Sequence, residues 1–297
     1  MEKAMQGLKL KAKSVTHDHL LGVANSCLSI KEEQKTIRIL DVGCGNGDLV
    51  SYLYLSFEAK YPNKNVELYG FDVFEHGAKK NDYLNGVIGK LSSFGPSVPW
   101  GERITTISNS ERWPYEDDYF DLILSNQVLE HVHDHDFLFS EVARTLKPGG
   151  FSAHLFPLSS CFVECHILVP LAHRIKNYEL LKSFIRFFIR VKAIRHFPDL
   201  LEKNMSLTRL SESYADYLVN YTNYPSTAKC LRLGRKYKMR TSFKYTKNFY
   251  LQKLRSMVGL NPRRTYDKNN TFADYGLFMF LKYVSCVTLF MQKENIK

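Results

Sequence analysis

Short apolar runs alternate with longer amphipathic stretches over the first half of the chain. The runs occupy 37–42 (IRILDV), 66–71 (VELYGF), 103–107, 120–125 (FDLILS) and 151–156. Runs of four to eight apolar residues rich in β-branched and aromatic side chains are typical of buried strands. Segments with helical spacing separate them, so strands alternate with helices. This order predicts βαβ units and an α/β fold with a doubly wound, mostly parallel sheet.

The rest of the chain follows different patterns. Residues 1–36 look helical, with an amphipathic stretch at 18–30, and the strand–helix core occupies 37–157. Residues 158–225 contain an apolar–basic helix at 178–197 and a second helix at 199–221, which we interpret as a helical cap inserted into the core. Residues 226–297 are expected to complete the sheet. Their predicted elements are a helix at 227–237, a strand at 238–245, and a helix turning into a final strand within 280–293.

Composition limits the class of protein. The chain has 297 residues, of which 44% are hydrophobic and 24% charged, as in ordinary globular proteins. The six cysteines form no CxxC pair, so reduced thiols in a cytoplasmic protein are the simplest interpretation. The basic N-terminus has no apolar core of a secretory signal. The longest apolar run, 277–291, is interrupted by Lys282 and falls short of the roughly 20 residues of a spanning helix.

Charge is unevenly distributed. Residues 1–160 hold 16 Lys and Arg against 21 Asp and Glu, whereas residues 161–261 hold 19 against 6. The net charge of the whole chain is +11. A basic block of this size favours an anionic partner, such as a membrane face, a phosphorylated substrate or nucleic acid, or is simply a solvated basic surface. Aromatic residues are interleaved with cations at 229–255, but no RNA-binding motif accompanies them, so nucleic acid is not expected.

A glycine turn follows the first predicted strand. Gly43, Gly45 and Gly47 allow a sharp bend and a close approach of the backbone to a ligand. Asp72 ends the second strand, where a carboxylate can accept hydrogen bonds from ribose hydroxyls. Both features lie at the carboxyl edge of the predicted sheet, where such sheets bind ligands. The sixth position of the glycine pattern is Asp48, which disfavours the pyrophosphate of a nicotinamide dinucleotide.

Four runs occur in order with regular spacing: ILDVGCGNGDL, YGFDV, WPYEDDYFDLILSNQVLEHV and ARTLKPGGF. Together they resemble the class I S-adenosylmethionine-dependent methyltransferases, in particular a methyltransferase type 11/12-like core. The resemblance covers about 35–157 strongly and the C-terminal strands weakly. It implies a seven-stranded Rossmann-like sheet, S-adenosyl-L-methionine as cofactor, and transfer of its methyl group to an acceptor.

The resemblance also implies cofactor-binding roles for residues that match the motifs. The methionine part would contact Asp41, Gly43 and Gly45, with Gly47 opening the helix. Asp72 would bind the ribose hydroxyls and Val73 would pack on the adenine. The adenine edge would meet Asn109 and Ser110, and the sulfonium end would lie near Ser125, Asn126 and Gln127. Within the turn, Cys44 is expected to be a small buried side chain rather than a reactive thiol.

A hydroxyl acceptor needs a base to take its proton, and three residues are candidates. Glu164 and His166 lie in the run FPLSSCFVECHILVPLAH, which resembles the entry to the substrate cap of methyltransferases acting on sugars or glycolipids. There they would act as orienter and base. His131 is the third candidate, although packing beneath the site is the commoner role. We expect His133 and His135 at the surface.

No metal is expected. Glu130 and His131 are similar to a pair that binds a divalent metal in ubiquinone-biosynthesis O-methyltransferases, but the acidic residue of that family, three positions before the Glu, is Gln127 here. Cys161, Cys165 and His166 could suggest zinc, yet no second pair of ligands follows.

The predicted function is therefore methyl transfer from S-adenosylmethionine to a small acceptor, most simply O-methylation of a sugar or glycan-linked intermediate. One alternative is a lipid or quinone methyltransferase at a membrane surface. The mixed apolar and basic helix at 178–197 would then lie on the inner, anionic face of the bilayer. The other alternative is a non-catalytic S-adenosylmethionine-binding module.

Overall fold

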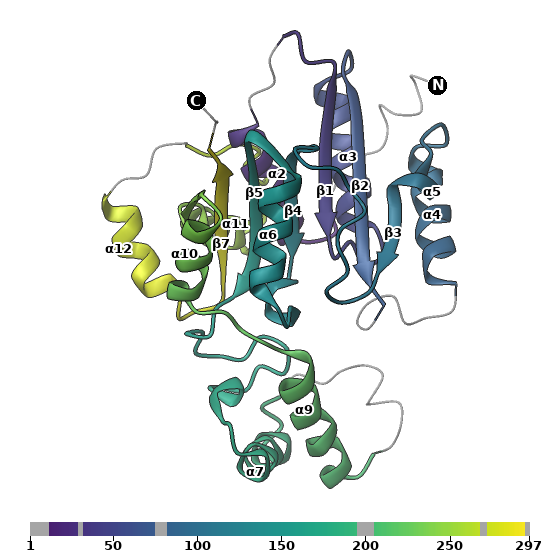
Figure 1. Ribbon diagram of the computed structural model, residues 1–297. Coiled ribbons are helices and arrows are strands. Elements are labelled where there is room, and N and C mark those ends of the chain that lie inside the picture. The colour runs from purple at the N-terminus through teal and green to yellow at the C-terminus, as the bar shows by residue number, and fades with distance from the viewer. Residues whose placement is uncertain (1–11, 29–31, 75–81, 195–204, 268–271, 295–297) are drawn as a thin grey trace.

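Seven strands form one sheet in the order β3-β2-β1-β4-β5-β7-β6 (Figure 1). The computed structural model describes residues 12–28, 32–74, 82–194, 205–267 and 272–294. β7 runs antiparallel to both of its neighbours, and the other neighbouring strands are parallel. The strands are β1 (Thr36–Val42), β2 (Asn65–Val73), β3 (Ile104–Ile107), β4 (Phe120–Asn126), β5 (Leu146–Pro157), β6 (Met239–Ser242) and β7 (Cys286–Lys293). The predicted doubly wound, mostly parallel sheet is confirmed.

Helices cover both faces of this sheet, and two more form the cap (Figure 1). The helices beside the sheet are α2 (Val15–Cys27), α3 (Asp48–Lys60), α4 (Tyr83–Phe94), α5 (Trp100–Arg103), α6 (His135–Thr145), α10 (Thr227–Lys236), α11 (Thr246–Met257) and α12 (Phe272–Leu281). The cap contains α7 (Tyr178–Arg190) and α9 (Leu207–Tyr221), and the 3-10 turns are η1 (Leu129–His131) and η2 (Ala172–Arg174).

The alternation of side chains along β1 explains the two-sided core. Ile37 and Ile39 pack into the cluster formed with α2, α3 and α11, whereas Leu40 and Val42 pack into the cluster formed with α6 and α10. Successive strand residues point to opposite faces, so a strand that is apolar at both sets of positions must be covered on both sides. This is why the central strands are continuous apolar runs.

The cap extends beyond the carboxyl ends of the parallel strands and has a core of its own (Figure 1). Leu181 and Ile185 of α7 are buried against Tyr214 and Leu218 of α9. At the start of each helix an Asn177 or Ser206 side chain accepts a hydrogen bond from a first-turn amide, the usual helix cap. The cap therefore presents its own residues to the edge of the sheet where a ligand would bind.

Several predicted boundaries were wrong. β5 begins at Leu146, before the lysine–proline–glycine–glycine segment, because Leu146 already pairs with Phe120 across a β-bulge. The strand predicted at 238–245 ends at Ser242. A helix that sequence reasoning missed, α11, follows it, because Tyr245 and Phe249 at helical spacing are buried on the α2 side of the sheet.

Other predicted segments extend outside the described residues. The helix predicted at 75–91 is described only from Tyr83, the cap helices predicted at 178–197 and 199–221 are each described in part, and the N-terminal segment is described only from residue 12. Within the described residues, no helix combines the length and the apolar character needed to span a bilayer.

Candidate active site

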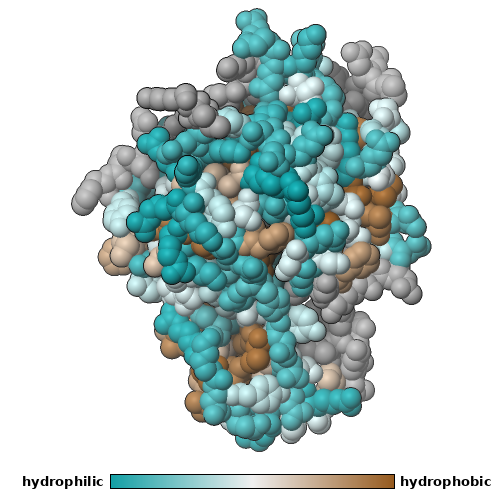
Figure 2. Space-filling view, viewed as in Figure 1, coloured by the Kyte–Doolittle hydropathy of each residue, from teal (hydrophilic) through white to brown (hydrophobic). Residues whose placement is uncertain are grey.

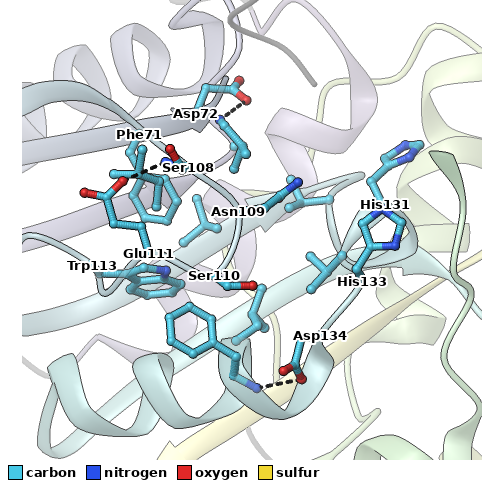
Figure 3. A pocket seen from close by; sticks show the side chains of 18 of the residues that line it. Phe71, Asp72, Ser108, Asn109, Ser110, Glu111, Trp113, His131, His133 and Asp134 are labelled. Atoms are coloured by element: carbon cyan, nitrogen blue, oxygen red, sulfur yellow. Dashed lines mark hydrogen bonds between the residues drawn. The ribbon is translucent and has the colours of Figure 1, made fainter. Parts of the chain in front are cut away.

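A cavity of about 260 Å³ opens at the carboxyl edge of the sheet, between β1, β2, β3 and the segment after β4 (Figure 3). Its walls are mostly apolar, with a few polar groups. The residues that line the cavity include Gly43, Asp72, Val73, Ser108, Asn109, Ser110, Glu111, Trp113, Gln127, Val128, His131 and His133. An apolar cleft with few convergent polar groups at this edge of an α/β sheet is the usual form of a small-molecule site.

The glycine turn sits at the floor of the cavity and is tied to β2. The amide of Gly43 donates to the Phe71 carbonyl at 2.9 Å, and the amide of Gly45 donates to Asp72 Oδ2 at 2.8 Å. Gly43 adopts φ +71°, and a Cβ there would lie 2.5 Å from Val128 Cγ2. The turn thus needs glycine for conformation and for space. Gly47, also at positive φ, caps α3 but does not line the cavity.

Asp72 lies at the end of β2 and lines the cavity, although only 8% of it is exposed. Its Oδ1 accepts the Val73 amide at 2.7 Å, and its Oδ2 accepts the Gly45 amide. These bonds fix the carboxylate in one orientation and leave acceptor capacity on each oxygen. Val73 lines the cavity beside it. Asp72 and Val73 thus line one cavity, and their contacts with the ribose and the adenine stay predictions.

Asp41 is buried behind the turn, and its Oδ1 has no hydrogen-bond partner among the described residues. Burial, helped by the charge of Asp72, raises the pKa of this carboxyl well above its usual value. A buried carboxyl with an unsatisfied oxygen is costly unless a donor or a positive charge meets it. Cys44 is also buried, and burial followed by the charges of Asp41 and Asp72 raises its thiol pKa well above normal. This agrees with a structural rather than a reactive cysteine.

The turn after β3 forms the opposite wall of the cavity. Asn109 and Ser110 line it, and Ser110 has φ +65°, an unusual conformation for a residue other than glycine. The Ser108 amide donates to Glu111 Oε2 at 2.8 Å, which fixes the turn. Trp113 is buried and packs on Phe71 with ring centroids 5.0 Å apart. Sequence reasoning missed Glu111 and Trp113, although a tryptophan shortly after a strand end was a usable signal.

The three residues predicted after β4 have different surroundings. Ser125 is fully buried in the sheet and shares a 2.8 Å hydrogen bond with His154 Nδ1. Asn126 donates to Thr16 Oγ1 at 3.1 Å, which joins α2 to the sheet. Of the three, Gln127 alone lines the cavity; it adopts φ +59° and donates to Cys286 Sγ at 3.1 Å. Non-glycine residues in this conformation are concentrated at functional sites.

A second polar cluster adjoins the cavity through His131. His166 Nδ1 lies 2.7 Å from Glu164 Oε1, and His166 Nε2 lies 3.2 Å from His131 Nε2. The three predicted base residues therefore meet in space, although His131 and His166 are 35 positions apart in the sequence. They are Glu164, His166 and His131. Glu164 comes from the cap loop, whereas His131 comes from η1 at the end of the core.

Glu164 is held as a carboxylate. Its side chain is fully buried, and burial alone would raise its pKa. Hydrogen bonds from His166, from the Ile167 amide at 2.7 Å and from the Tyr224 hydroxyl outweigh burial and lower the pKa. The fixed negative charge orients the His166 ring and stabilises a proton on Nδ1. Tyr224, which comes from the segment after α9, was missed by sequence reasoning.

Of the two histidines expected at the surface, His133 is exposed, as predicted, and His135 is not. His135 was expected at the surface, but it is buried: its Nε2 lies 2.9 Å from the Leu129 carbonyl and its Nδ1 lies 2.9 Å from Lys229 Nζ. Burial, with the Lys229 charge, lowers its pKa to about 4. The prediction failed because the segment after η1 turns inward beneath α10. His133 lines the cavity near His131 (Figure 3).

The fold and the site define a Rossmann-like enzyme core with a pocket at its carboxyl edge. Comparison with protein families matches residues 24–202, more than half of the chain, to the family described as a methyltransferase domain. The chain therefore belongs to this methyltransferase family, and the resemblance seen in the sequence is confirmed. Membership supports S-adenosylmethionine as the cofactor.

Individual relatives are distant. The chain is 26% identical over 208 residues to the ubiquinone/menaquinone biosynthesis C-methyltransferase UbiE of Cupriavidus metallidurans, which covers 67% of this chain and 75% of that protein. It is 30% identical over 162 residues to UbiE of Vibrio vulnificus, covering 50% and 57%. It is 27% identical over 154 residues to the malonyl-[acyl-carrier protein] O-methyltransferase of Hahella chejuensis, covering 50% and 48%. The chain thus spans about half the length of the last two.

One solved structure that the chain resembles is an S-adenosylmethionine-dependent methyltransferase from Mesorhizobium loti. That likeness has a TM-score of 0.48 at 14% identity and covers 94% of this chain and all of the other. A likeness at this score supports no argument about the site.

The residues of the cavity fit the cofactor. At Gly45 nothing lies within 4 Å of the place that a Cβ would take, so the backbone is open to a ligand there. A fixed carboxylate stands at the end of β2, and Asp41, which does not line the cavity, has an unsatisfied oxygen behind the turn. These groups would suit the methionine part and the ribose of the cofactor, as the sequence resemblance predicts.

Proposed function

We propose that the protein transfers the methyl group of S-adenosylmethionine to a hydroxyl oxygen of a small acceptor bound between the core and the cap. The observation that carries this proposal is the position of His131. It lines the cofactor cavity and also lies within hydrogen-bonding distance of His166, which Glu164 orients. One residue thus connects the donor side of the site to a base on the acceptor side.

The chain's residues divide the work between binding and proton removal. Gly43, Asp72 and Asn109 hold and orient the donor, whose sulfonium supplies an activated methyl group when bound. Alignment of donor and acceptor provides much of the rate enhancement. As the carbon–sulfur bond breaks and the carbon–oxygen bond forms, the hydroxyl proton passes to an imidazole Nε2 of the histidine pair. Glu164 stabilises the resulting positive charge through Nδ1.

A sugar hydroxyl remains the acceptor that the sequence predicts. The relatives described above are named for a quinone pathway and for a malonyl carrier protein, so they do not support a sugar. The polar cluster supports an acceptor that loses a proton when it is methylated, because an oriented histidine base can remove that proton. A hydroxyl oxygen meets this requirement, whereas a thioether sulfur has no proton to lose.

Methyl transfer from radiolabelled S-adenosylmethionine to cell extract, followed by identification of the labelled product, tests this function. We expect His166→Ala and His131→Ala each to lower turnover by at least about 100-fold. Their affinity for S-adenosylhomocysteine should remain within threefold of the parent's. Unchanged turnover in both variants would remove the two base candidates, and transfer of label to a carbon atom would refute the oxygen acceptor.

A lipid acceptor at a membrane is a second candidate, favoured by exposed apolar side chains next to cations. On α7, Leu180 is 60% exposed and Phe187 58% exposed, although Leu181 and Ile185 of the same helix are buried. Figure 2 shows apolar side chains on the cap surface. On α11 and its following turn, Met257 is 80% exposed beside Arg255. Residues 217–266 contain 12 Lys and Arg and no Asp or Glu.

Vesicle flotation separates the two candidates. A membrane enzyme would float with phosphatidylglycerol vesicles at low salt but not with phosphatidylcholine vesicles. Phe187→Glu would then weaken flotation if α7 contacts the membrane, and Met257→Glu would weaken it if α11 does. Absence of flotation with both vesicle types at low salt would refute the membrane alternative and leave the small-acceptor proposal unchanged.

A further inference from the structure

Three side chains at the junction of core and cap bring their ligand atoms together. The carboxylate of Glu130 and one imidazole nitrogen from each of His131 and His166 all lie within 4.8 Å of one another. Glu130 and His131 belong to η1, and His166 belongs to the cap loop. Two histidines and a carboxylate are a common set of protein ligands for a divalent transition metal such as Zn²⁺.

The hydrogen bonds of the two rings fix where their protons are. His131 Nδ1 lies 2.6 Å from the Tyr221 carbonyl oxygen, which can only accept, so this nitrogen carries a proton. His166 Nδ1 lies 2.7 Å from Glu164 Oε1, a carboxylate oxygen that also receives the Tyr224 hydroxyl proton. This nitrogen must carry a proton too. In the neutral rings, both Nε2 atoms are therefore lone-pair acceptors.

Those two Nε2 atoms face each other at 3.2 Å. Two lone pairs at this distance repel each other unless a positive charge lies between them. Two nitrogen ligands at Zn–N distances of about 2.0–2.1 Å and a tetrahedral angle are separated by about 3.3 Å. The observed separation of 3.2 Å is close to that value, so the two nitrogens are spaced as two ligands of one ion would be.

Glu130 provides the missing negative charge. Its side chain is fully buried, and neither carboxylate oxygen has a hydrogen-bond partner among the described residues. An isolated buried carboxyl carries a large desolvation penalty, which coordination to a cation relieves. Among the described residues, its side-chain oxygens are the polar atoms of the cluster that lack a partner.

The hydrogen-bond acceptors of the two Nδ1 atoms are of the kind found behind metal-binding histidines. A histidine that binds a metal through one nitrogen usually donates its other ring proton to a carboxylate or a backbone carbonyl. Here Glu164 and the Tyr221 carbonyl fill those two roles, one for each ring.

We propose that Glu130, His131 and His166 bind one divalent transition-metal ion at the junction of core and cap. The sequence argued against a metal because residue 127 is not acidic; the structure brings His166 from the cap, 35 residues beyond His131, as a different third ligand. Metal binding itself does not depend on the proposed function, and only the effect of the metal on methyl transfer rests on it. A cation here would occupy both Nε2 lone pairs, so the imidazole base of the proposed function would act only in the metal-free protein. With the cation bound, the ion itself would lower the pKa of an acceptor hydroxyl, and it would also tie the cap to the core.

The test uses the full chain without a histidine tag, treated with EDTA and exchanged into metal-free buffer. Titration with Co²⁺ should give the visible absorption of a four- or five-coordinate site at one equivalent, and Zn²⁺ should displace it. Zn²⁺ should also raise the melting temperature. His166→Ala and Glu130→Gln should each weaken Zn²⁺ binding at least tenfold, whereas the neighbouring His133→Ala should bind like the parent.

Each outcome decides the proposal. Absence of saturable binding, or equal Zn²⁺ affinity in His166→Ala and the parent, would overturn it. Because Glu130→Gln changes a fully buried side chain, the circular dichroism of this variant is compared with that of the parent first. If Glu130→Gln fails to fold, the result for His166→Ala decides the proposal alone. Methyl transfer by the EDTA-treated protein would keep the imidazole-base function even if metal binding fails. A cobalt spectrum without any methyl transfer would keep the metal site and reject the proposed function.

Discussion

The proposed donor half and the proposed acceptor half of the site are built in different ways. The proposed donor half lies at neighbouring strand ends of the core: Gly43 after β1, Asp72 at the end of β2, and the turn at 108–111 after β3. The acceptor half is assembled from η1, the cap loop and the segment after α9, which meet only in the folded chain. Sequence motifs are therefore a direct guide to the first half and a weak guide to the second.

This difference also appears in the hydrogen bonds. Donor-side bonds tie neighbouring strands, as between Gly45 and Asp72. Acceptor-side bonds tie residues 90 positions apart, as between His131 and Tyr221. A change on the donor side should therefore affect cofactor affinity, and a change on the acceptor side should affect turnover. Substitutions on each side can test whether cofactor affinity and turnover change independently.

The largest effect is expected at Glu164. Glu164→Gln removes the charge that fixes the proton on His166 Nδ1, so the ring can adopt the wrong tautomer. We expect kcat to fall by about 1000-fold, near the middle of the range for loss of an acid–base group. Calorimetric affinity for S-adenosylhomocysteine should stay within threefold. Equal losses of affinity and turnover would show that the two halves are not separate.

The next largest effect is expected at Asp72. Asp72→Asn keeps the shape but removes the charge that would bind the ribose hydroxyls. Hydrogen bonds to a charged group contribute about 1.5–3 kcal/mol, so affinity for S-adenosylhomocysteine should fall by about 30-fold. Asp82→Asn, a change at the exposed N-cap of α4, serves as the control. If Asp72→Asn bound as tightly as the parent, the ribose assignment would be wrong.

A pair of glycines provides a smaller, internally controlled effect. Both Gly43 and Gly45 have positive φ, but a Cβ at Gly43 would meet Val128 at 2.5 Å, whereas a Cβ at Gly45 meets nothing within 4 Å. Gly45→Ala should cost about 1 kcal/mol of unfolding free energy from backbone strain alone. Gly43→Ala should cost about 1–3 kcal/mol more because of the clash. Chemical denaturation measures both, and equal losses would contradict the close packing of the turn.

The smallest effect concerns histidines outside the site. His19 is fully buried between Tyr266 and Thr288, and burial lowers its pKa to about 3. The unfolded chain takes up this proton near pH 6.5 and the folded chain does not, so stability falls as pH drops below 6.5. His19→Gln should flatten this slope by up to about 1.4 kcal/mol per pH unit between pH 6 and 4. Urea unfolding at three pH values checks it; parallel slopes would mean that His19 titrates normally.

Much of the fold could be predicted because the information is local. The β1, β2 and β4 runs are apolar on both faces and end in glycine or a polar residue, so their positions followed from periodicity. The N-terminal boundary of β5 was missed because pairing across a bulge extends a strand through a segment whose residues indicate a turn. The helix α11 was missed because the aromatic residues of 245–250 suit a strand as well as a helix, and only packing decides between them.

The candidate site also contains residues that the sequence could locate and contacts that it could not. Asp72, Gly43, Asn109 and Ser110 could be placed because motif and strand end coincide. His131 and His166 could be named individually, but their contact depends on how the cap folds over the core, and no spacing rule encodes it. Glu130 was considered only as half of a pair, because its complete burial is a tertiary property.

The central claim is that donor and acceptor halves face one another across His131. A crystal structure with bound S-adenosylhomocysteine tests this most directly. The account predicts ribose hydroxyls on the Asp72 carboxylate, the adenine between Val73 and Asn109, and the thioether sulfur directed toward His131. Electron density for the nucleoside anywhere else, or a sulfur directed away from the histidine pair, would contradict it.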